Sequence, residues 1–190
     1  QGLYDMATYF NIPMTSGKDS MKNDLRHDGQ VISVPPTILY SMACGLKDVR
    51  QTLTSHAKAA GDLVYQLGST YDELGASELA RTVLGTLGAN CPLVRKEQAR
   101  ALYLKVMQAS RTGLIESCHD LSDGGLAVAL AETVMASGCG AEIELSEALL
   151  ADDCHDHLLR KQVVALFAES HSRFVVTVRP AQQQAFEALL

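Results

Sequence analysis

Two stretches of the sequence combine glycine with acidic and hydroxyl side chains, and both could hold phosphate together with a metal ion. They are SGKDSMKND at residues 16–24 and CHDLSDGGLAVALAE at residues 118–132. Bare glycine backbone allows a ligand to approach closely, and carboxylate and hydroxyl oxygens suit Mg²⁺. Neither stretch contains GxxxxGK[ST], so neither is a P-loop. For each of them a solvent-exposed turn is the alternative interpretation.

The second stretch predicts a helix that begins just after HDLSD. Ser122 or Asp123 can cap this helix by accepting a hydrogen bond from a backbone N–H of the first turn. Gly124 and Gly125 would then occupy the first turn, where glycine is unfavourable. The free N–H groups and the helix dipole would favour a phosphate there, and Asp120 is placed to bind Mg²⁺. An ordinary capped turn with close helix–strand packing remains the alternative.

The first stretch has the same two interpretations. Gly17 permits close approach of a ligand, and Lys18 offers a positive charge for phosphate. Asp19 and Ser20 offer oxygen ligands or hydrogen bonds. A solvated turn that follows a short strand would use the same residues.

Three other features are weaker candidates. The run DDCHDH at residues 152–157 is rich in metal-ligating side chains, but its two histidines share a face only on a strand. His119 is either catalytic or a positioned, partly buried histidine, and Cys118 beside it shows no nucleophile pattern. Glu78 either stabilises a helix N-terminus or faces a cleft. The sequence alone therefore assigns no catalytic residue.

The composition is that of an acidic globular chain. Of its 190 residues, 47% are hydrophobic and 20% are charged, and the formal net charge is −6. Because there is no basic block, a nucleic-acid partner is disfavoured, and no apolar run approaches the length of a membrane span. Five cysteines at scattered spacings, without a CxxC pair, indicate free thiols in a reducing cytoplasm.

Hydrophobic periodicity predicts a chain in which helices and strands alternate. The elements expected to position the second stretch are a strand at 114–117 and a helix carrying Leu126, Leu130 and Val134. The other predicted helices lie at 3–10, 79–87, 95–110 and from Pro180 onward, and the other predicted strands lie at 12–15, 31–45, 63–67, 141–145 and 174–178. Residues 47–61 are predicted to be a linker or domain junction. Both ends read as interrupted helices, so we expect a segment of a longer protein.

Five blocks in order resemble the formylglycinamidine ribonucleotide synthase family, the amidotransferases of purine synthesis. They are SGKDSMKND, PPTILYSMACGLKDVRQTLT, LGASELA, HDLSDGGLAVALAE and LFAESHSRFVVTV. This family belongs to the aminoimidazole ribonucleotide synthetase superfamily, whose synthetases have two homologous halves, each with a β-rich N-terminal and an α/β C-terminal domain. The resemblance implies an α+β fold, with residues 1–57 from the end of an N-terminal domain and residues 58–190 from a truncated C-terminal domain.

The resemblance also implies an ATP-dependent reaction in the cytoplasm. In this family the formamide oxygen of formylglycinamide ribonucleotide is phosphorylated to an iminophosphate, and ammonia from glutamine then displaces phosphate. The implied cofactors are Mg²⁺ and ATP or ADP. The implied partners are the rest of the synthetase, a glutaminase domain or subunit, and a second copy bound through the N-terminal portion. Neither nucleic acid nor a membrane is expected.

Matched motif by motif, Asp120 corresponds to a Mg²⁺ ligand of the family. Asp19 is a second candidate metal ligand on the ground of its carboxylate alone. Ser122 and Gly17 correspond to nucleotide contacts. Ser20 corresponds to a contact with substrate or phosphate.

Three more residues complete the implied site. Gly124 and Gly125 are expected to approach the phosphate. Lys18 departs from the smaller enzymes of the family, which have a metal-contacting asparagine there. Because a charged lysine cannot ligate Mg²⁺, it is expected to contact the nucleotide phosphate directly, as in the large, glutaminase-fused enzymes.

Two alternatives remain open. The segment could hold a structural ADP–Mg²⁺ that is not turned over, or it could belong to another enzyme of the superfamily. The isolated 190-residue chain is expected to lack synthase activity, because the first synthetase half and the glutaminase are missing from it.

Overall fold

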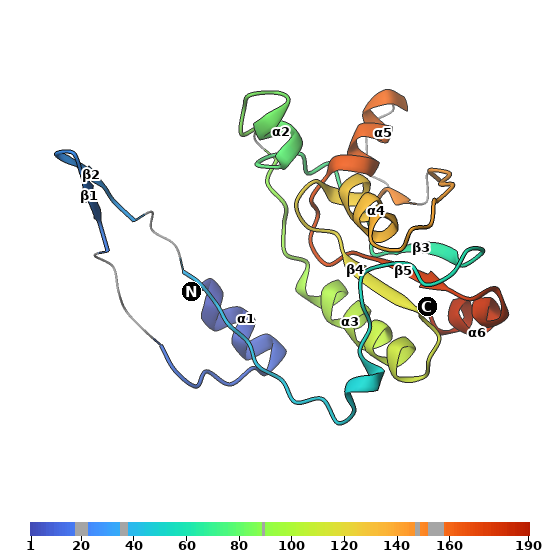
Figure 1. The fold of residues 1–190 in the computed structure, drawn as a ribbon. Helices are drawn as coiled ribbons and strands as arrows, with labels where there is room; N and C mark the ends of the chain where they lie inside the picture. Colours follow the sequence, from blue (N-terminus) through green and yellow to red (C-terminus); the bar gives the residue numbers. More distant parts are fainter. Residues whose placement is uncertain (18–22, 35–37, 89, 147–148, 152–157) are drawn as a thin grey trace. The chain divides into compact units, whose positions relative to one another are not determined.

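The computed structural model describes residues 1–17, 23–34, 38–88, 90–146, 149–151 and 158–190. Two compact units can be distinguished, Gln1–Val49 and Arg50–Leu190 (Figure 1). Helices and strands are interspersed along the chain, which confirms the predicted α+β class.

The described residues of the first unit form a helix and a two-stranded sheet without a buried core. Helix α1 (Gly2–Phe10) ends at Asn11, whose left-handed φ of 56° turns the chain. Strand β1 (Leu25–His27) pairs antiparallel with β2 (Gln30–Ile32). None of the described residues in this unit is buried, so its strands lack the apolar face that would make such a sheet stable alone.

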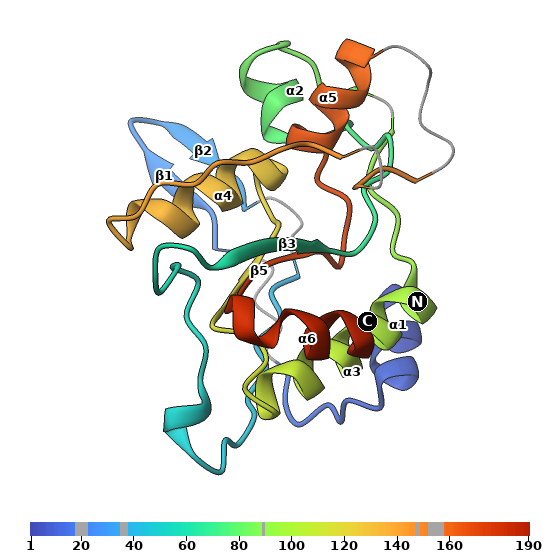
Figure 2. The same cartoon turned by 90° about the vertical axis from the view of Figure 1, so that its right-hand side faces the viewer.

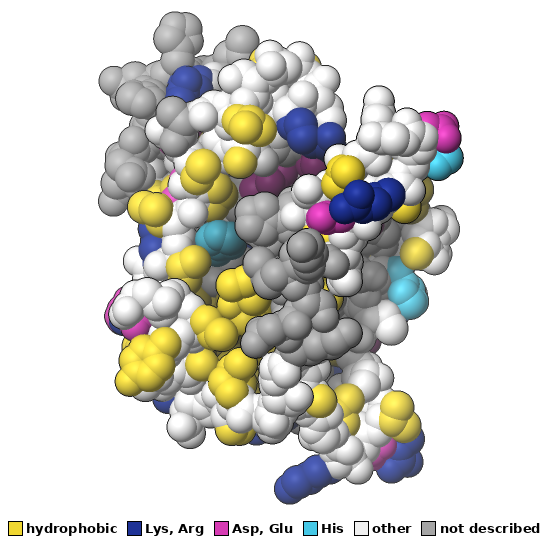
Figure 3. All heavy atoms as spheres, turned by 90° about the vertical axis from the view of Figure 1, so that its left-hand side faces the viewer, with side chains coloured by type: hydrophobic (Ala, Val, Ile, Leu, Met, Phe, Trp, Pro, Cys, Tyr) yellow, Lys and Arg dark blue, Asp and Glu magenta, His cyan; other side chains and the backbone are white. Residues whose placement is uncertain are grey.

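Two strand predictions in this unit are wrong. Residues 12–15 form no strand, and within the described part of 31–45 only the first two residues belong to β2. The hydrophobic side chains that suggested these strands remain exposed, among them Ile38, Leu39 and Met42. Exposed hydrophobic side chains can be seen in yellow on the face drawn in Figure 3.

The second unit is built on a three-stranded antiparallel sheet. Strand β5 (Phe174–Val178) lies in the centre, between β3 (Leu63–Leu67) and β4 (Ser117–Asp120). Its sequence, FVVTV, is β-branched at four of five positions, which suits a strand covered on both faces. The strands predicted at 63–67 and 174–178 are confirmed with these bounds.

Helices cover both faces of this sheet (Figure 2). On one face, α3 (Lys96–Arg111) and α6 (Gln183–Leu189) enclose a core in which Val176 and Val178 meet Phe186. On the other face, α4 (Gly125–Met135) packs on Val175, and α5 (Leu158–Phe167) packs against α4. Because successive strand residues point to opposite faces, β5 supplies both cores.

Short elements connect these layers. They are η1 (Val49–Gln51), α2 (Glu78–Thr82) and η3 (Pro180–Gln182), and the last begins at a proline as predicted. Among the described residues, none of the helices is both long and apolar enough to cross a membrane.

Three predicted boundaries in the second unit are corrected by the structure. α2 ends at Thr82 instead of 87, because Gly85 turns the chain with a φ of +63°. β4 begins three residues later than expected, since Ile115 packs into the core from the connection before the strand. Residues 141–145 form no strand, and no described strand is paired with them.

Candidate functional site

A cleft of about 510 Å³ lies beside the end of β4, where the HDLSDGG stretch leads into α4. Three loops that are distant in the sequence line it: the LGAS segment before α2, the segment after β4, and the ESHSR segment before β5. Its lining includes Gly75, Ala76, Asp120, Ser122, Glu169 and His171. Three of the five sequence blocks therefore meet at one place.

Asp120 offers an ionised carboxylate to this cleft. The hydroxyl of Ser122 donates a hydrogen bond to Asp120 Oδ2, and this bond is the main reason why the pKa of Asp120 lies below its usual value. The neighbouring His119 lowers the same pKa further. With 67% of its side chain exposed, Asp120 can accept a cation without first breaking a buried contact.

The N-terminus of α4 is capped differently from the prediction. Gly124 is the N-cap, with a φ of +80°, and no side chain accepts a capping bond there. The N–H of Gly124 donates instead to Glu169 Oε1 at 2.8 Å, and the N–H of Gly125 donates to the Ser122 carbonyl at 3.1 Å. The expected side-chain cap from Ser122 or Asp123 is therefore wrong.

Both glycines are closely packed, as the alternative interpretation of this stretch expected. Gly125 has a φ of +64°, and a Cβ on it would lie 2.6 Å from the carbonyl oxygen of Ala168. A Cβ on Gly124 would meet the side chain of Val128. Both glycines are buried in this structure, so their spacing is explained by backbone conformation and close packing. Whether they also contact a ligand stays a prediction.

Glu169 connects two parts of the cleft, and sequence reasoning missed it. Its Oε1 accepts from the N–H of Gly124 and also from the N–H of Glu78, the first residue of α2, at 2.8 Å each. The side chain of Glu78 itself pairs with Arg81 at 2.6 Å. This position favours the helix-end interpretation of Glu78 over a position facing the cleft.

Arg173 is the second residue that the sequence interpretation missed. Its side chain is 1% exposed, and its guanidinium donates to the carbonyls of Ala168 and Ser170 and to the hydroxyl of Thr70. Burial lowers its pKa to about 10, which leaves it charged at neutral pH. An arginine directly before an apolar strand was the available signal, since such a side chain must find buried partners.

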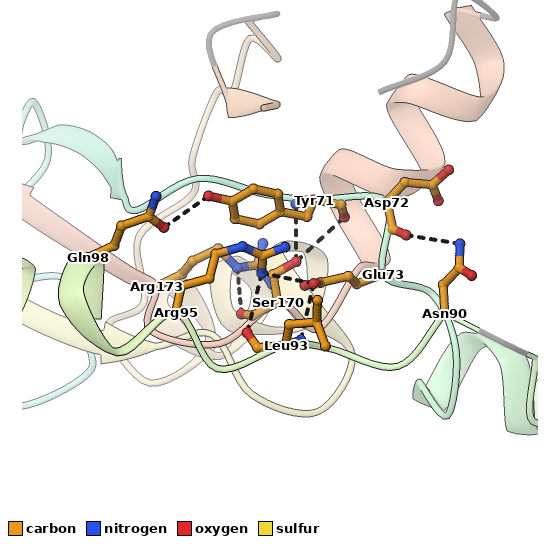
Figure 4. A network of polar contacts seen from close by, with 9 residues as sticks. All are labelled: Tyr71, Asp72, Glu73, Asn90, Leu93, Arg95, Gln98, Ser170 and Arg173. Atoms are coloured by element: carbon orange, nitrogen blue, oxygen red, sulfur yellow. Dashed lines mark hydrogen bonds and ion pairs between the residues drawn. The ribbon is translucent and has the colours of Figure 1, made fainter. Parts of the chain in front are cut away.

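A polar network extends from this arginine towards α3 (Figure 4). Ser170 accepts the N–H of Tyr71 at 3.1 Å, and the Tyr71 hydroxyl donates to Gln98 at 3.0 Å. Arg95 stacks 3.3 Å above the Tyr71 ring and pairs with the buried Glu73 at 2.8 Å. The hydrogen bonds of Ser170 and Arg173 thus fix the loop that carries Glu169.

His119 lies in β4, directly before Asp120. Its Nε2 is 2.7 Å from Glu132 Oε2 on α4, and its Nδ1 is 3.4 Å from Asp120 Oδ1. Its side chain is 16% exposed, in keeping with the partly buried, positioned histidine. Burial raises the pKa of the adjacent Cys118 thiol to about 11, so this cysteine is no nucleophile at neutral pH.

The remaining predicted residues belong to the first unit or lie outside the described residues. Gly17 belongs to the first unit and is exposed, with open space around its Cα. Lys18, Asp19 and Ser20 lie outside the described residues, as does the DDCHDH run at 152–157. Among the residues that are described, no three His, Cys, Asp or Glu side chains form a group that could hold a metal alone.

Comparisons with known proteins show which family this chain resembles. Residues 59–190 match the family described as "AIR synthase related protein, C-terminal domain". The phosphoribosylformylglycinamidine synthase subunit PurL of Limosilactobacillus reuteri is 33% identical over all 190 residues, which span 23% of that protein. This relative confirms the resemblance inferred from the sequence blocks.

Solved structures share the fold. Thermotoga maritima PurL complexed with FGAR superimposes with a TM-score of 0.60 at 22% identity, over 74% of this chain and 23% of that one. The same protein complexed with ADP gives a TM-score of 0.56 at 20% identity, over 74% and 21% of the two chains. Because the family match alone covers more than half of the sequence, this chain belongs to the family of AIR synthase related proteins, and residues 59–190 match their C-terminal domain.

Proposed function

We propose that this chain is a segment of a formylglycinamidine ribonucleotide synthase. The whole enzyme would convert formylglycinamide ribonucleotide, glutamine and ATP to formylglycinamidine ribonucleotide, glutamate, ADP and phosphate. The supporting observation is the cleft, which joins three of the family-like blocks around an ionised, exposed Asp120. The identity to PurL along the entire chain supports the same assignment, although the chain spans about a quarter of that relative.

The cleft is proposed to bind the phosphate groups of ATP or ADP together with Mg²⁺. The carboxylates of Asp120 and Asp123 line it, so a free phosphate without a cation would be repelled. The donor set fits Mg²⁺, which is usually held by one or two carboxylates with phosphate oxygens and water as further ligands. When bound, the metal would neutralise charge on the transferred phosphoryl group.

The side chains of this unit would act by orientation. Ser122 orients the Asp120 carboxylate through its hydroxyl, and the oriented carboxylate would serve as a ligand of the metal. Ser122 would also contact the nucleotide, and Gly124 and Gly125 would lie near the phosphates. Electrostatic groups that are fixed before the reaction need no rearrangement as charge develops, which is how such sites accelerate phosphoryl transfer.

The SGKDS loop of the first unit is proposed to bind a ligand of the same class, a nucleotide phosphate with Mg²⁺. There Gly17 and Lys18 would contact the nucleotide, Ser20 the substrate or phosphate, and Asp19 the metal. Residues 1–57 would complete a β-rich domain, and the exposed hydrophobic residues of the first unit support a need for further chain around it. Residues 58–190 would form the C-terminal domain.

The proposal extends to partners and location. Glutamine would be the amide donor, so a glutaminase domain or subunit would supply ammonia. The enzyme would work in the cytoplasm, where free thiols are stable. A second copy could pair through the first unit, whose strands lack a covering layer.

The experiment that tests the cleft is Mg²⁺-dependent binding of ADP, measured by titration calorimetry with the wild-type chain, Asp120→Asn and Glu142→Ala. Glu142 is exposed and lies outside the cleft, so E142A serves as the control. D120N should weaken binding about tenfold or more, the effect of losing one charged ligand, and E142A should match the wild type. Equal affinities for D120N and the wild type would refute the assignment.

Turnover separates the two roles of the nucleotide. In a full-length synthase that contains this sequence, D120N should abolish product formation if the bound nucleotide is consumed. If the nucleotide is structural, D120N should instead release co-purifying ADP and lower the melting temperature, with product formation retained.

A further inference from the structure

We propose that Glu169 is the positioning residue of the cleft: one of its carboxylate oxygens holds the backbone of both α2 and α4, and so places Asp120 and Ser122 for their ligand. This inference rests on the proposed function for the identity of the ligand, Mg²⁺ with a nucleotide phosphate. The positioning itself rests only on contacts within the second unit.

The contact geometry is unusual for a partly exposed glutamate. Oε1 of Glu169 accepts two backbone N–H groups, from Glu78 and Gly124, which lie 91 and 45 residues away in the sequence. Both bonds are 2.8 Å long, a length typical of a charged acceptor. A surface glutamate placed only for solubility would gain nothing from two such fixed partners, because ordering its side chain has an entropic cost.

The loop that carries Glu169 is itself held rigidly. The buried guanidinium of Arg173 donates to the carbonyls of Ala168 and Ser170, the residues on either side of Glu169. The Ser170 hydroxyl accepts the N–H of Tyr71. Glu169 therefore projects from a backbone that is fixed at the 168–169 and 170–171 peptide groups, which gives its carboxylate a defined position.

The segment that Glu169 holds is the one that bears the candidate ligand residues. Gly124 is bonded to Glu169, and Gly125 rests on the carbonyl of Ala168 beside it. The N–H of Leu121 donates to the Arg173 carbonyl at 3.0 Å. The turn from 120 to 125 is thus attached at both ends to the 168–173 loop, and Asp120 and Ser122 project from it into the cleft.

Because Glu169 already occupies the N–H of Gly124, it acts through the backbone of the turn. A shorter side chain that no longer reaches the N–H of Gly124 should release the turn. A side chain of the same length without the charge should not. Two variants separate these properties. Glu169→Gln keeps the length and one acceptor oxygen but removes the charge, and Glu169→Asp keeps the charge but withdraws the oxygens by ~1.5 Å, about one C–C bond.

The experiment compares wild type, E169Q, E169D and E169A in the 190-residue chain, with E142A as an exposed Glu→Ala control outside the cleft. Two quantities are measured for each: the amide resonances of Gly124, Glu78, Asp120 and Ser122 by NMR, and the affinity for Mg²⁺–ADP. E169D and E169A should shift all four resonances and weaken Mg²⁺–ADP about tenfold or more, as removal of hydrogen bonds to a charged acceptor does. E169Q should stay within about threefold of the wild type, since one acceptor is retained.

Each of these measurements supports or overturns the positioning role of Glu169. Unchanged resonances of Asp120 and Ser122 in E169A would overturn the positioning role, and so would an E169Q spectrum displaced as far as that of E169A. If the wild-type chain binds no Mg²⁺–ADP, the proposed function fails, while the four resonances still establish or reject the positioning. Control E142A should match the wild type in both measurements.

Discussion

Replacing Gly125 with alanine should strongly destabilise the second unit. The new Cβ would lie 2.6 Å from the Ala168 carbonyl oxygen and 2.9 Å from that of Leu166, and neither backbone atom can rotate away as a side chain could. Forcing a methyl group into filled space costs ~1–3 kcal/mol. The φ of +64° costs an L-residue about 1–2 kcal/mol more. We therefore expect a loss of about 2–5 kcal/mol in the free energy of unfolding.

Gly113→Ala is the matched control. Gly113 has nearly the same backbone conformation, with a φ of +68°, but nothing lies within 4 Å of the Cβ that alanine would add. Gly113→Ala should lose only the part of the free energy of unfolding that comes from the left-handed backbone conformation, about 1–2 kcal/mol. The difference between the two variants, about 1–3 kcal/mol, then measures the steric conflict with the 166–168 backbone alone.

Urea unfolding followed by far-ultraviolet circular dichroism suits this comparison, because the chain has no tryptophan to report on its core. Equal m-values for the two variants would show that the change lies in stability and not in the extent of unfolding. If G125A and G113A lose the same free energy, the close packing of α4 on the 166–168 segment is refuted, and the positions argued for Gly124 and Glu169 would have to be revised with it.

Three further predictions concern buried or titrating groups. Arg173→Met should lower the free energy of unfolding by ~3–5 kcal/mol, the effect of removing a charged partner from a buried network, and urea unfolding measures this loss. R173K should recover only part of the lost stability, because one ammonium group cannot replace the planar guanidinium. Cys118, with a pKa of about 11, should react with iodoacetamide at pH 8 far more slowly than the exposed Cys44, and equal labelling rates by mass spectrometry would contradict its burial. Ser122→Ala should raise the pKa of Asp120 in an NMR titration, because the hydroxyl bond is the main cause of its lowered value. The folded-state pKa of Asp120 lies below the unfolded one, so its contribution to stability is present above the unfolded pKa and is lost as pH falls through the folded pKa; S122A should shrink that acid-dependent loss.

Three elements of the second unit were predictable from the hydrophobic pattern of their own segments. β3 and β5 are short apolar runs bounded by glycine, polar residues or proline, and their bounds agree with the prediction. α3 alternates apolar and polar positions at helical spacing and is displaced by one residue. Such elements are determined locally, since the pattern of one segment is enough to say which face it buries.

The contacts that build the cleft were not predictable in the same way. Glu169 and Gly124 are 45 residues apart in the sequence, and no local pattern indicates that a glutamate will replace the expected side-chain cap. The two glycines were interpreted as an opening for a ligand because their helix propensity is poor. The close neighbours of Gly125, the carbonyls before Glu169, arise from the packing of α4 on a distant segment. Positive-φ glycines packed on backbone and those exposed to a ligand look alike in a sequence.

Strand order also determines when this unit can fold. β5, the central strand, is the last of these three strands to be synthesised, about 110 residues after β3, with which it pairs. At translation rates of about 5–20 residues per second, β3 waits roughly 5–20 s for its neighbour. During that time the apolar sides of β3 and α3 are available to chaperones. A released chain that stops at residue 170 should therefore be digested rapidly by proteases, whereas the chain that includes β5 and α6 should resist.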